Sequence, residues 1–171
     1  MDLEAYIRDV PDFPKKGIIF KDITPLLADA AALEEAVRRL GRPYEGKGVQ
    51  VVTGIESRGF IFGGAVARRL RAGFVPLRKP GKLPYKTVKK EYALEYGTDA
   101  VEIHADAISP GQKVLMLDDL LATGGTMAAA CELVEGLGGR IVGVAFLIEL
   151  CFLKGRQKLP GYDIHTLIRV P

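Results

Sequence analysis

The sequence predicts an α/β protein with a central, mainly parallel sheet flanked by helices. Short apolar runs at Val49–Thr53, Phe74–Leu77 and Val114–Leu117, and a longer one at Ile141–Leu150, alternate with stretches of helical periodicity. Strands that are apolar along most of their length are typical of parallel sheets covered on both faces. A length of 171 residues without internal repeats or a linker favours a single domain over residues 1–171.

The N-terminal part of the chain is punctuated by proline and glycine. Leu3–Val10 is expected as a short helix, followed by an arm at Pro11–Pro25 whose centre, Ile18–Phe20, is apolar. Asp29 is a candidate N-cap for a longer helix. The apolar positions of that helix fall at i, i+4 and i+7 before a terminal glycine, and these residues are Leu33, Val37, Leu40 and Gly41.

The rest of the chain alternates between strands and helices. Phe60–Leu70 and Thr126–Leu137 have helical periodicity, while Tyr92–Tyr96 and Val101–His104 are predicted to form a hairpin that turns through Gly97. In a parallel α/β sheet, ligands bind beyond the carboxyl ends of the strands. The loops after the three short strands are therefore the segments in which to look for chemistry.

Composition narrows the class of protein. With 48% hydrophobic and 26% charged residues the chain is typical of a globular protein. Its longest apolar stretch, Ile141–Ile148, is far shorter than the ~20 residues that span a bilayer, and the first ten residues lack the pattern of a secretory signal. Cys131 and Cys151 show no metal-binding spacing and are expected in the core. These features favour a cytoplasmic protein that does not associate with membranes.

The positive charge is concentrated in one segment. The chain has 24 Lys and Arg and 21 Asp and Glu, a net charge of +3, and Arg78–Lys90 contains six of the cations and no acid. The remainder therefore sums to 18 − 21 = −3. Pro80, Gly81 and Pro84 interrupt regular structure within the segment, which predicts a long, mobile, cationic loop. Such a run is ordinarily a solvated surface, but it also suits a lid that closes over a polyanionic small molecule.

The strongest chemical signal is the thirteen-residue stretch Val114–Thr126. Two acids, Asp118 and Asp119, follow a buried strand and precede a loop of small residues that begins a helix. The backbone N–H groups and threonine hydroxyls of this loop can cradle an anion, and its glycines allow close approach of a phosphate. Acids beside a phosphate are suited to accept hydrogen bonds from hydroxyls, which together suggests a ribose 5-phosphate. The plainer alternative is that the acids cap the helix and the glycines form a tight turn.

A second anion site is predicted at Gly54–Phe60, directly after the strand that ends at Thr53. Arg58 can supply forked donors there, and Ser57 and Gly59 add a hydroxyl and accessible backbone. Taken in isolation, Arg58 would be an ordinary surface cation and Gly59 a turn residue.

In combination these segments resemble the type I phosphoribosyltransferases. Val114–Thr126 is similar to the family's phosphoribosyl pyrophosphate signature, and Ser57–Phe60 resembles the pyrophosphate loop of its adenine-specific branch. Arg78–Pro84 and Ala93–Gly97 resemble the two ends of that branch's flexible catalytic loop. The N-terminal arm resembles the hood that covers the purine, although Lys21 stands where some members have Arg and cannot reproduce its planar fork.

The resemblance implies a type I phosphoribosyltransferase fold with a hood over about residues 1–28 and a flexible catalytic loop over about residues 78–97. It also implies transfer of the phosphoribosyl group of 5-phosphoribosyl 1-pyrophosphate to adenine, giving AMP and pyrophosphate. Glu95 is then the catalytic acid or base, whereas from the strand pattern alone it would be a solvent-facing partner of lysines. The implied binding residues are Ala122, Thr123, Gly124, Gly125 and Thr126 for the 5-phosphate; Asp118 and Asp119 for ribose; Ser57, Arg58, Gly59, Arg78, Lys79 and Lys82 for pyrophosphate; and Ile19, Phe20, Lys21 and Leu150 for adenine.

The same resemblance implies Mg²⁺ held mainly by substrate phosphates and water, with no direct protein ligand, and a homodimer. Two alternatives share the phosphate machinery. A xanthine or other purine phosphoribosyltransferase would differ at the hood. A regulator that binds nucleic acid and senses phosphoribosyl pyrophosphate would need a basic patch elsewhere, and the −3 charge outside the cationic segment argues against nucleic acid as a partner.

Overall fold

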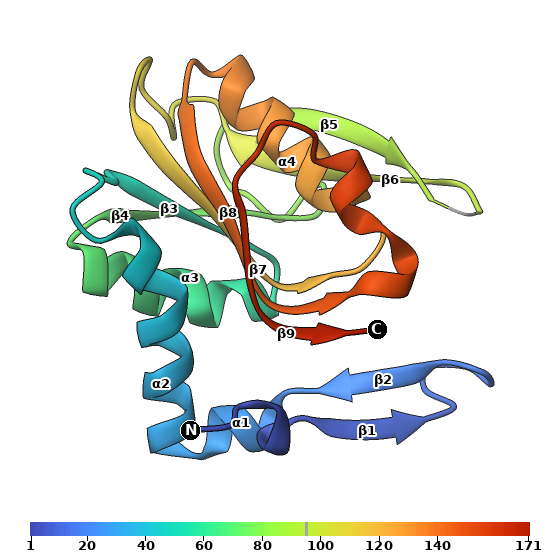
Figure 1. Cartoon of the computed structure of the whole chain (residues 1–171). Helices are drawn as coiled ribbons and strands as arrows, with labels where there is room; N and C mark the ends of the chain where they lie inside the picture. The colour runs from blue at the N-terminus through green and yellow to red at the C-terminus, as the bar shows by residue number, and fades with distance from the viewer. Residues whose placement is uncertain (95) are drawn as a thin grey trace.

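The central sheet is parallel, as the sequence predicts. The computed structural model describes residues 1–94 and 96–171, and its main sheet has the strand order β4-β3-β7-β8-β9 (Figure 1). The strands are β1 (Arg8–Pro11), β2 (Ile19–Asp22), β3 (Val51–Ile55), β4 (Gly73–Leu77), β5 (Thr87–Ala93), β6 (Thr98–His104), β7 (Lys113–Leu121), β8 (Arg140–Leu150) and β9 (Ile164–Val170). The α-helices are α1 (Thr24–Ala28), α2 (Ala30–Gly41), α3 (Arg58–Leu70) and α4 (Gly125–Gly136); short 3-10 turns are η1 (Glu4–Tyr6), η2 (Arg42–Tyr44), η3 (Cys151–Leu153) and η4 (Gly155–Lys158).

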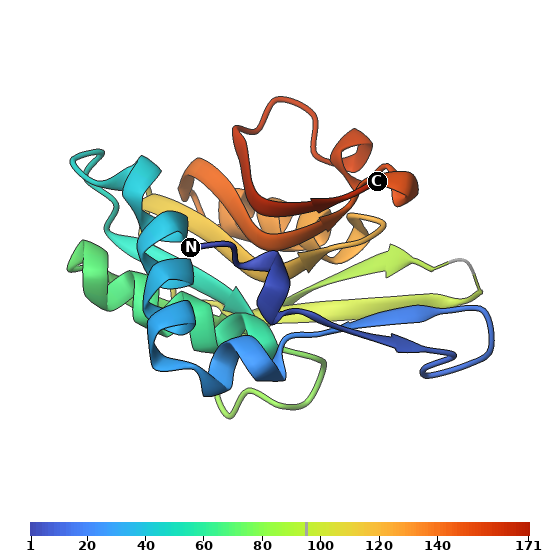
Figure 2. The ribbon, with the colours of Figure 1, turned by 60° about the horizontal axis from the view of Figure 1, so that its bottom comes forward.

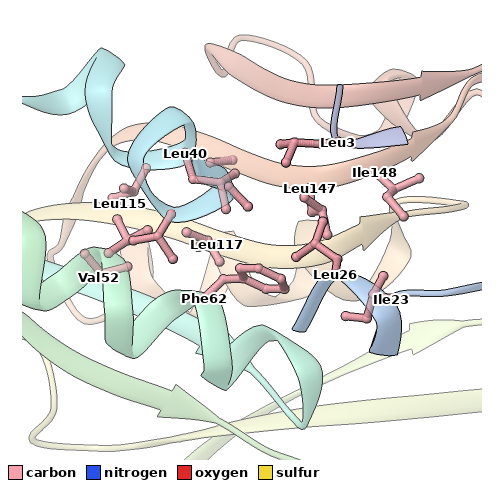
Figure 3. Close-up of a cluster of buried hydrophobic side chains, with 14 of the residues drawn as sticks. Leu3, Ile23, Leu26, Leu40, Val52, Phe62, Leu115, Leu117, Leu147 and Ile148 are labelled. Carbon is pink, nitrogen blue, oxygen red and sulfur yellow. The ribbon is translucent and has the colours of Figure 1, made fainter. Parts of the chain in front are cut away.

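Hydrophobic clusters cover both faces of the sheet, which explains why its strands are apolar along their length. Successive side chains of a strand point to opposite faces. In β7, Leu115 and Leu117 therefore join the cluster under α2 and α3, while Val114 and Met116 join the cluster under α4. Figure 3 shows the first cluster, in which Phe62 from α3 lies near Leu117. The two packed layers hold the carboxyl ends of the strands at one edge.

The N-terminal hood is a hairpin rather than the helix expected over Leu3–Val10. Only Glu4–Tyr6 forms a helical turn, and β1 pairs antiparallel with β2 so that Val10 lies opposite Phe20. Pairing with a distant strand overrides the weak local helical pattern. The cap predicted for the following helix is confirmed, because the Asp29 side chain accepts a 2.8 Å hydrogen bond from the N–H of Ala32.

A second hairpin, β5–β6, packs against the α4 side of the sheet. The sequence predicted a hairpin here, but β5 begins at Thr87, so Lys89 and Lys90 belong to a strand and the cationic loop ends earlier than expected. The cationic loop is shorter because β5 pairs with β6 from Thr87, which lies opposite His104. Figures 1 and 2 show both hairpins extending from the same end of the molecule.

Two further features differ from expectation. β9 (Ile164–Val170) lies outside every element that the sequence predicted; it is the edge strand beside β8, and polar residues interrupt its apolar ones without a regular period. Cys131 is buried as expected, but Cys151 is half-buried in a turn at the end of β8.

None of the helices in the described part of the chain is long and apolar enough to cross a membrane.

Candidate active site

Two loops at the carboxyl edge of the sheet bring the candidate site together. β3 and β7 are parallel neighbours, with Val51 beside Val114, so the loops that follow them open at the same edge. The first loop carries Glu56 and Ser57, which are joined by a cis peptide bond, and leads into α3 at Arg58. The second loop leads from β7 into α4. The sheet therefore places the two predicted anion-binding segments side by side.

The two acids lie within β7, which continues to Leu121 instead of ending before them. Arg58 of the neighbouring loop reaches across, and its Nε lies 2.7 Å from Oδ2 of Asp119. Oδ1 of Asp118 accepts a 2.8 Å hydrogen bond from the N–H of Asp119. A charged pair therefore links the predicted pyrophosphate loop to the predicted ribose-binding acids.

Gly59 permits the close approach of these two segments. A methyl group at this position would lie 2.6 Å from Oδ1 of Asp118 and 3.4 Å from its Cα, in direct conflict with the strand. The start of α3 can pack beside the carboxylate only because residue 59 has no side chain. Gly59 thus has a packing role in addition to the pyrophosphate contact predicted for it.

The acids sit in an environment that disfavours their charged forms. Burial raises the pKa of Asp118 well above its usual value, and the neighbouring charge of Asp119 raises it further. Burial also raises the pKa of Asp119, although the Arg58 guanidinium offsets part of that rise. Carboxylates held in this way gain from additional hydrogen-bond donors, which a pair of vicinal hydroxyls can supply.

The loop after β7 is shaped to receive a small anion. Gly124 has a φ of +83°, a left-handed conformation that favours glycine, and it is the N-cap of α4. Because Gly124 has no side chain to accept from the first-turn N–H groups, these donors are left for a ligand. A cavity of about 80 Å³ opens here and is lined by Asp118, Leu120, Leu121, Ala122, Thr123, Gly124, Gly125, Thr126, Met127 and Phe146.

A larger cavity of about 400 Å³ joins this loop to the other predicted phosphate contacts. Its residues come from the hood, the two loops and the cationic segment: Phe20, Ile55, Glu56, Ser57, Arg58, Lys79, Asp118, Asp119, Leu120 and Thr126. The guanidinium of Arg58 lies 5.1 Å from the centre of the Phe20 ring, a cation–π distance. The cavity therefore brings most of the predicted ribose and pyrophosphate residues to one place.

Besides Arg58, two more of the predicted pyrophosphate cations are already paired with carboxylates. Arg78 donates to both oxygens of Glu56 at 3.3 and 3.1 Å, and the Arg78 side chain holds the pKa of Glu56 below its usual value. The ammonium of Lys79 pairs with Asp99 of β6. Lys82 is exposed on the loop beyond them.

Tyr92 connects the cationic segment to the phosphate loop. Its hydroxyl accepts a 3.0 Å hydrogen bond from Thr126 Oγ1 and one of 3.2 Å from Lys79, and it donates to Asp99 at 3.2 Å. Sequence reasoning missed Glu56, Tyr92 and Asp99. Glu56 lay inside a recognised loop, but the hairpin register that brings Tyr92 and Asp99 opposite each other has no local sequence signal.

The hood forms one wall of a further cavity of about 480 Å³. Alternation along β2 sends Ile19 and Lys21 toward this cavity, and Phe20 toward the one near Arg58. Leu150, at the end of β8, lines the other side. Three of the four predicted purine residues therefore gather around an apolar cavity, whose lining is Gly17, Ile18, Ile19, Lys21, Leu150, Phe152, Leu153, Val170 and Pro171.

Comparison with known proteins places these features in a family. Residues 20–164 match the model of the phosphoribosyl transferase domain. An adenine phosphoribosyltransferase of Halothermothrix orenii is 56% identical over 169 residues, which is 99% of either chain. This chain belongs to the adenine phosphoribosyltransferase family. Its fold is the type I phosphoribosyltransferase fold expected from the sequence.

Solved structures of family members superpose along nearly the whole chain. The crystal structure of adenine phosphoribosyltransferase from Thermoanaerobacter pseudethanolicus is 55% identical with a TM-score of 0.95, covering 98% of each chain. The enzyme from Giardia lamblia, crystallised with 9-deazaadenine, is 41% identical with a TM-score of 0.93, covering 99% of this chain and 97% of its own. The β1–β2 hairpin of the hood and the β5–β6 hairpin are thus within the matched length.

The predicted catalytic residue, Glu95, lies outside the described residues.

Within residues 1–94 and 96–171, side chains that could ligate a metal do not gather in groups of three or more. The carboxylates of Asp118 and Asp119 line the larger cavity beside the two phosphate-binding segments, together with that of Glu56, which is paired with Arg78. Mg²⁺ is commonly held by one or two carboxylates together with substrate phosphates, so this donor set is compatible with the ion.

Proposed function

We propose that this chain transfers the phosphoribosyl group of 5-phosphoribosyl 1-pyrophosphate to adenine, releasing pyrophosphate and forming AMP. The observation that carries the proposal is the ion pair of Arg58 and Asp119, because it lies between a loop suited to a 5-phosphate and cations suited to a pyrophosphate. A molecule bound there needs a phosphate, a diol and a second anionic group in that order. Phosphoribosyl pyrophosphate has this arrangement.

The residues of the two loops divide the phosphoribosyl donor between them. The backbone of residues 122–126 and the hydroxyls of Thr123 and Thr126 bind the 5-phosphate. Asp118 and Asp119 accept hydrogen bonds from the ribose hydroxyls, which relieves the crowding of two neighbouring carboxylates. Ser57, Arg58 and Gly59 meet the pyrophosphate, with Arg78, Lys79 and Lys82 approaching from the cationic segment. Charge neutralisation there favours departure of the leaving group.

The base enters from the hood side. Ile19, Phe20, Lys21 and Leu150 enclose adenine, with the 480 Å³ cavity as the candidate pocket for its ring. The bond from ribose C1 to the pyrophosphate oxygen breaks as the bond from C1 to N9 of adenine forms, and N9 gives up its proton. Glu95 is the proposed group for that proton transfer.

Mg²⁺, where bound, supplies neutralisation of the pyrophosphate charge. Asp118 and Asp119 are the residues of this chain suited to meet the ion, either directly or through water. We also assign the chain to the cytoplasm and to a homodimer, on the basis of its two free cysteines and its family. Its ligands are small molecules rather than nucleic acid, because the residues outside Arg78–Lys90 carry a net charge of −3.

One assay tests the proposed function. Purified protein is given phosphoribosyl pyrophosphate and Mg²⁺ with adenine, hypoxanthine, guanine, xanthine, orotate or uracil in separate reactions, and nucleotide formation is followed by chromatography. We expect AMP as the dominant product. A preference for xanthine or another purine would move the assignment to a different purine phosphoribosyltransferase, and binding of phosphoribosyl pyrophosphate without turnover of any base would favour a sensor.

A further inference from the structure

A buried carboxylate stands at the end of β8, away from the charges discussed above. Glu149 is 3% exposed and forms a two-pronged ion pair with Arg156, whose Nε and Nη2 lie 2.6 and 2.7 Å from its two oxygens. Thr166 of β9 donates to the same carboxylate at 3.1 Å. The Arg156 side chain holds the pKa of Glu149 below its usual value, so the pair is charged at neutral pH. Nothing in the proposed chemistry uses this pair.

The position of Glu149 indicates a structural role for its ion pair with Arg156. Glu149 of β8 pairs in register with Leu121 of β7, which is the residue immediately before the phosphate loop. Glu149 also directly precedes Leu150, which lines the hood cavity. Arg156 follows β8 by a short turn and also donates to the carbonyl of Ile164 at 3.3 Å. The ion pair therefore folds the segment after β8 back over the carboxyl edge of the sheet.

The segment after β8 brings the backbone of Gly155 into close contact with the backbone of the phosphate loop. Gly155, next to Arg156, is packed so tightly that a Cβ would collide with the carbonyl of Ala122 and lie 2.9 Å from Cδ1 of Leu121. In the reverse direction, a Cβ on Gly124 would collide with the carbonyl of Gly155. Two glycines thus form the contact between the phosphate loop and the segment held by Arg156.

We infer that Arg156 is a positioning residue: its pair with Glu149 presses Gly155 against residues 122–124 and so sets the shape of the 5-phosphate cradle. The inference rests on the proposed function. Its physical basis is that the loop binds through backbone N–H groups, whose directions depend on where the main chain lies, and displacements of about 1 Å at such sites can cost about 100-fold.

The first experiment changes the contact without changing any charge. Ribose 5-phosphate and Mg-pyrophosphate binding are measured separately by calorimetry for wild type, Gly155→Ala and Gly136→Ala. Gly136 is the matched control, because a Cβ there meets open space at the far end of α4. We expect Gly155→Ala to weaken ribose 5-phosphate binding at least about tenfold and to leave pyrophosphate binding within about twofold, since only the cradle is displaced. Gly136→Ala should match wild type.

The second experiment tests the ion pair. Arg156→Gln should weaken ribose 5-phosphate binding selectively, and Arg156→Lys should restore part of it because the charge returns without the fork. Arg169→Gln is the control, since Arg169 also faces Glu149, at 3.5 Å, but its side chain is 63% exposed. If Arg156→Gln does not fold, Gly155→Ala still decides the matter.

Three results would overturn the inference. Equal losses of ribose 5-phosphate and pyrophosphate binding would reduce Arg156 to a general structural role. Wild-type affinity in Gly155→Ala would show that the contact does not shape the cradle. A wild-type protein that binds neither ligand would remove the proposed function itself, whereas AMP formation together with an unaffected Gly155→Ala would remove only the inference.

Discussion

Arg58 Nε lies 2.7 Å from Oδ2 of Asp119, and this one contact joins the loop after β3 to the acids of β7. The side chain of Asp119 is 7% exposed, whereas that of Arg58 is 33% exposed. The arginine can therefore turn a face toward a ligand while still compensating a buried charge. We therefore expect the pair to contribute both to folding and to ligand binding.

Removal of the arginine tests both roles. We expect Arg58→Gln to leave Asp119 buried without its counter-ion, at a cost of about 2 kcal/mol, which is below the ~3–5 kcal/mol of a fully buried pair because Arg58 is partly solvated. A change of that size corresponds to a Tm decrease of roughly 4–8 °C in a chain of this length. Pyrophosphate binding should also weaken. The measurements are thermal unfolding and calorimetric titration.

The matched control is Arg8→Gln. Arg8 also faces an aspartate, Asp22 at 3.6 Å, but its side chain is 64% exposed. We expect unchanged Tm and unchanged pyrophosphate affinity, because exposed pairs contribute little. Equal effects from the two substitutions would contradict the assignment of a special role to Arg58.

Asp118→Asn should make the protein more stable and a weaker ligand binder. Burial raises the pKa of Asp118 in the folded state, so the folded protein holds this proton more tightly than the unfolded chain does. That stabilisation is complete below the unfolded pKa and is lost as pH rises through the folded pKa, so at neutral pH the ionised group opposes folding. Asparagine carries no charge, and we expect a Tm higher by about 2–4 °C, or about 1 kcal/mol.

The stability gain should vanish in acid. Below the unfolded pKa, wild type carries a protonated Asp118 and should approach the Tm of the variant. Ribose 5-phosphate binding at neutral pH should weaken in Asp118→Asn, and further in the double variant with Asp119→Asn. Wild-type affinity in the double variant would contradict the role of these acids toward the ribose hydroxyls.

Glu95→Gln tests the proposed proton transfer. Glutamine preserves the shape of the side chain but cannot take up a proton, so turnover should fall by about 100- to 10,000-fold while phosphoribosyl pyrophosphate binding stays nearly intact. Steady-state kinetics and calorimetry provide the two measurements. Glu91→Gln, four positions earlier in the sequence, is the control and should retain full turnover. Unchanged turnover in Glu95→Gln would remove this residue from the chemistry.

Limited trypsin digestion tests whether the cationic segment responds to substrate. Lys82 and Lys86 are exposed before β5 begins, and we expect cleavage there to slow when phosphoribosyl pyrophosphate and Mg²⁺ are added. Lys47 is an internal control, because it is exposed in a turn that precedes β3 and is not part of the candidate site. Peptide mass analysis distinguishes the cuts. Equal rates at Lys82 with and without substrate would argue against a closing lid.

Local signals in the sequence were sufficient for much of the fold. The apolar runs within β3 and β7 are typical of strands in a parallel sheet covered on both faces, and Asp29 begins α2 through a hydrogen bond to a residue three positions away. The helix expected over Leu3–Val10 was wrong, because β1 is stabilised by pairing with β2 some ten residues later. β9 was missed for a similar reason, since an edge strand whose apolar residues are interrupted by polar ones without a regular period has a weak local pattern.

The candidate site likewise has features that the local sequence indicates and features that only the fold brings together. By itself the sequence indicated which loops are predicted to carry the chemistry, because the residues of an anion cradle or a forked donor are contiguous and their spacing is visible. Only the tertiary structure decided which charges meet: Arg58 with Asp119, Lys79 with Asp99, and Arg156 with Glu149. Each of these pairs depends on strand register or on a turn that folds back over the sheet, and such distances between segments leave no periodicity in the chain.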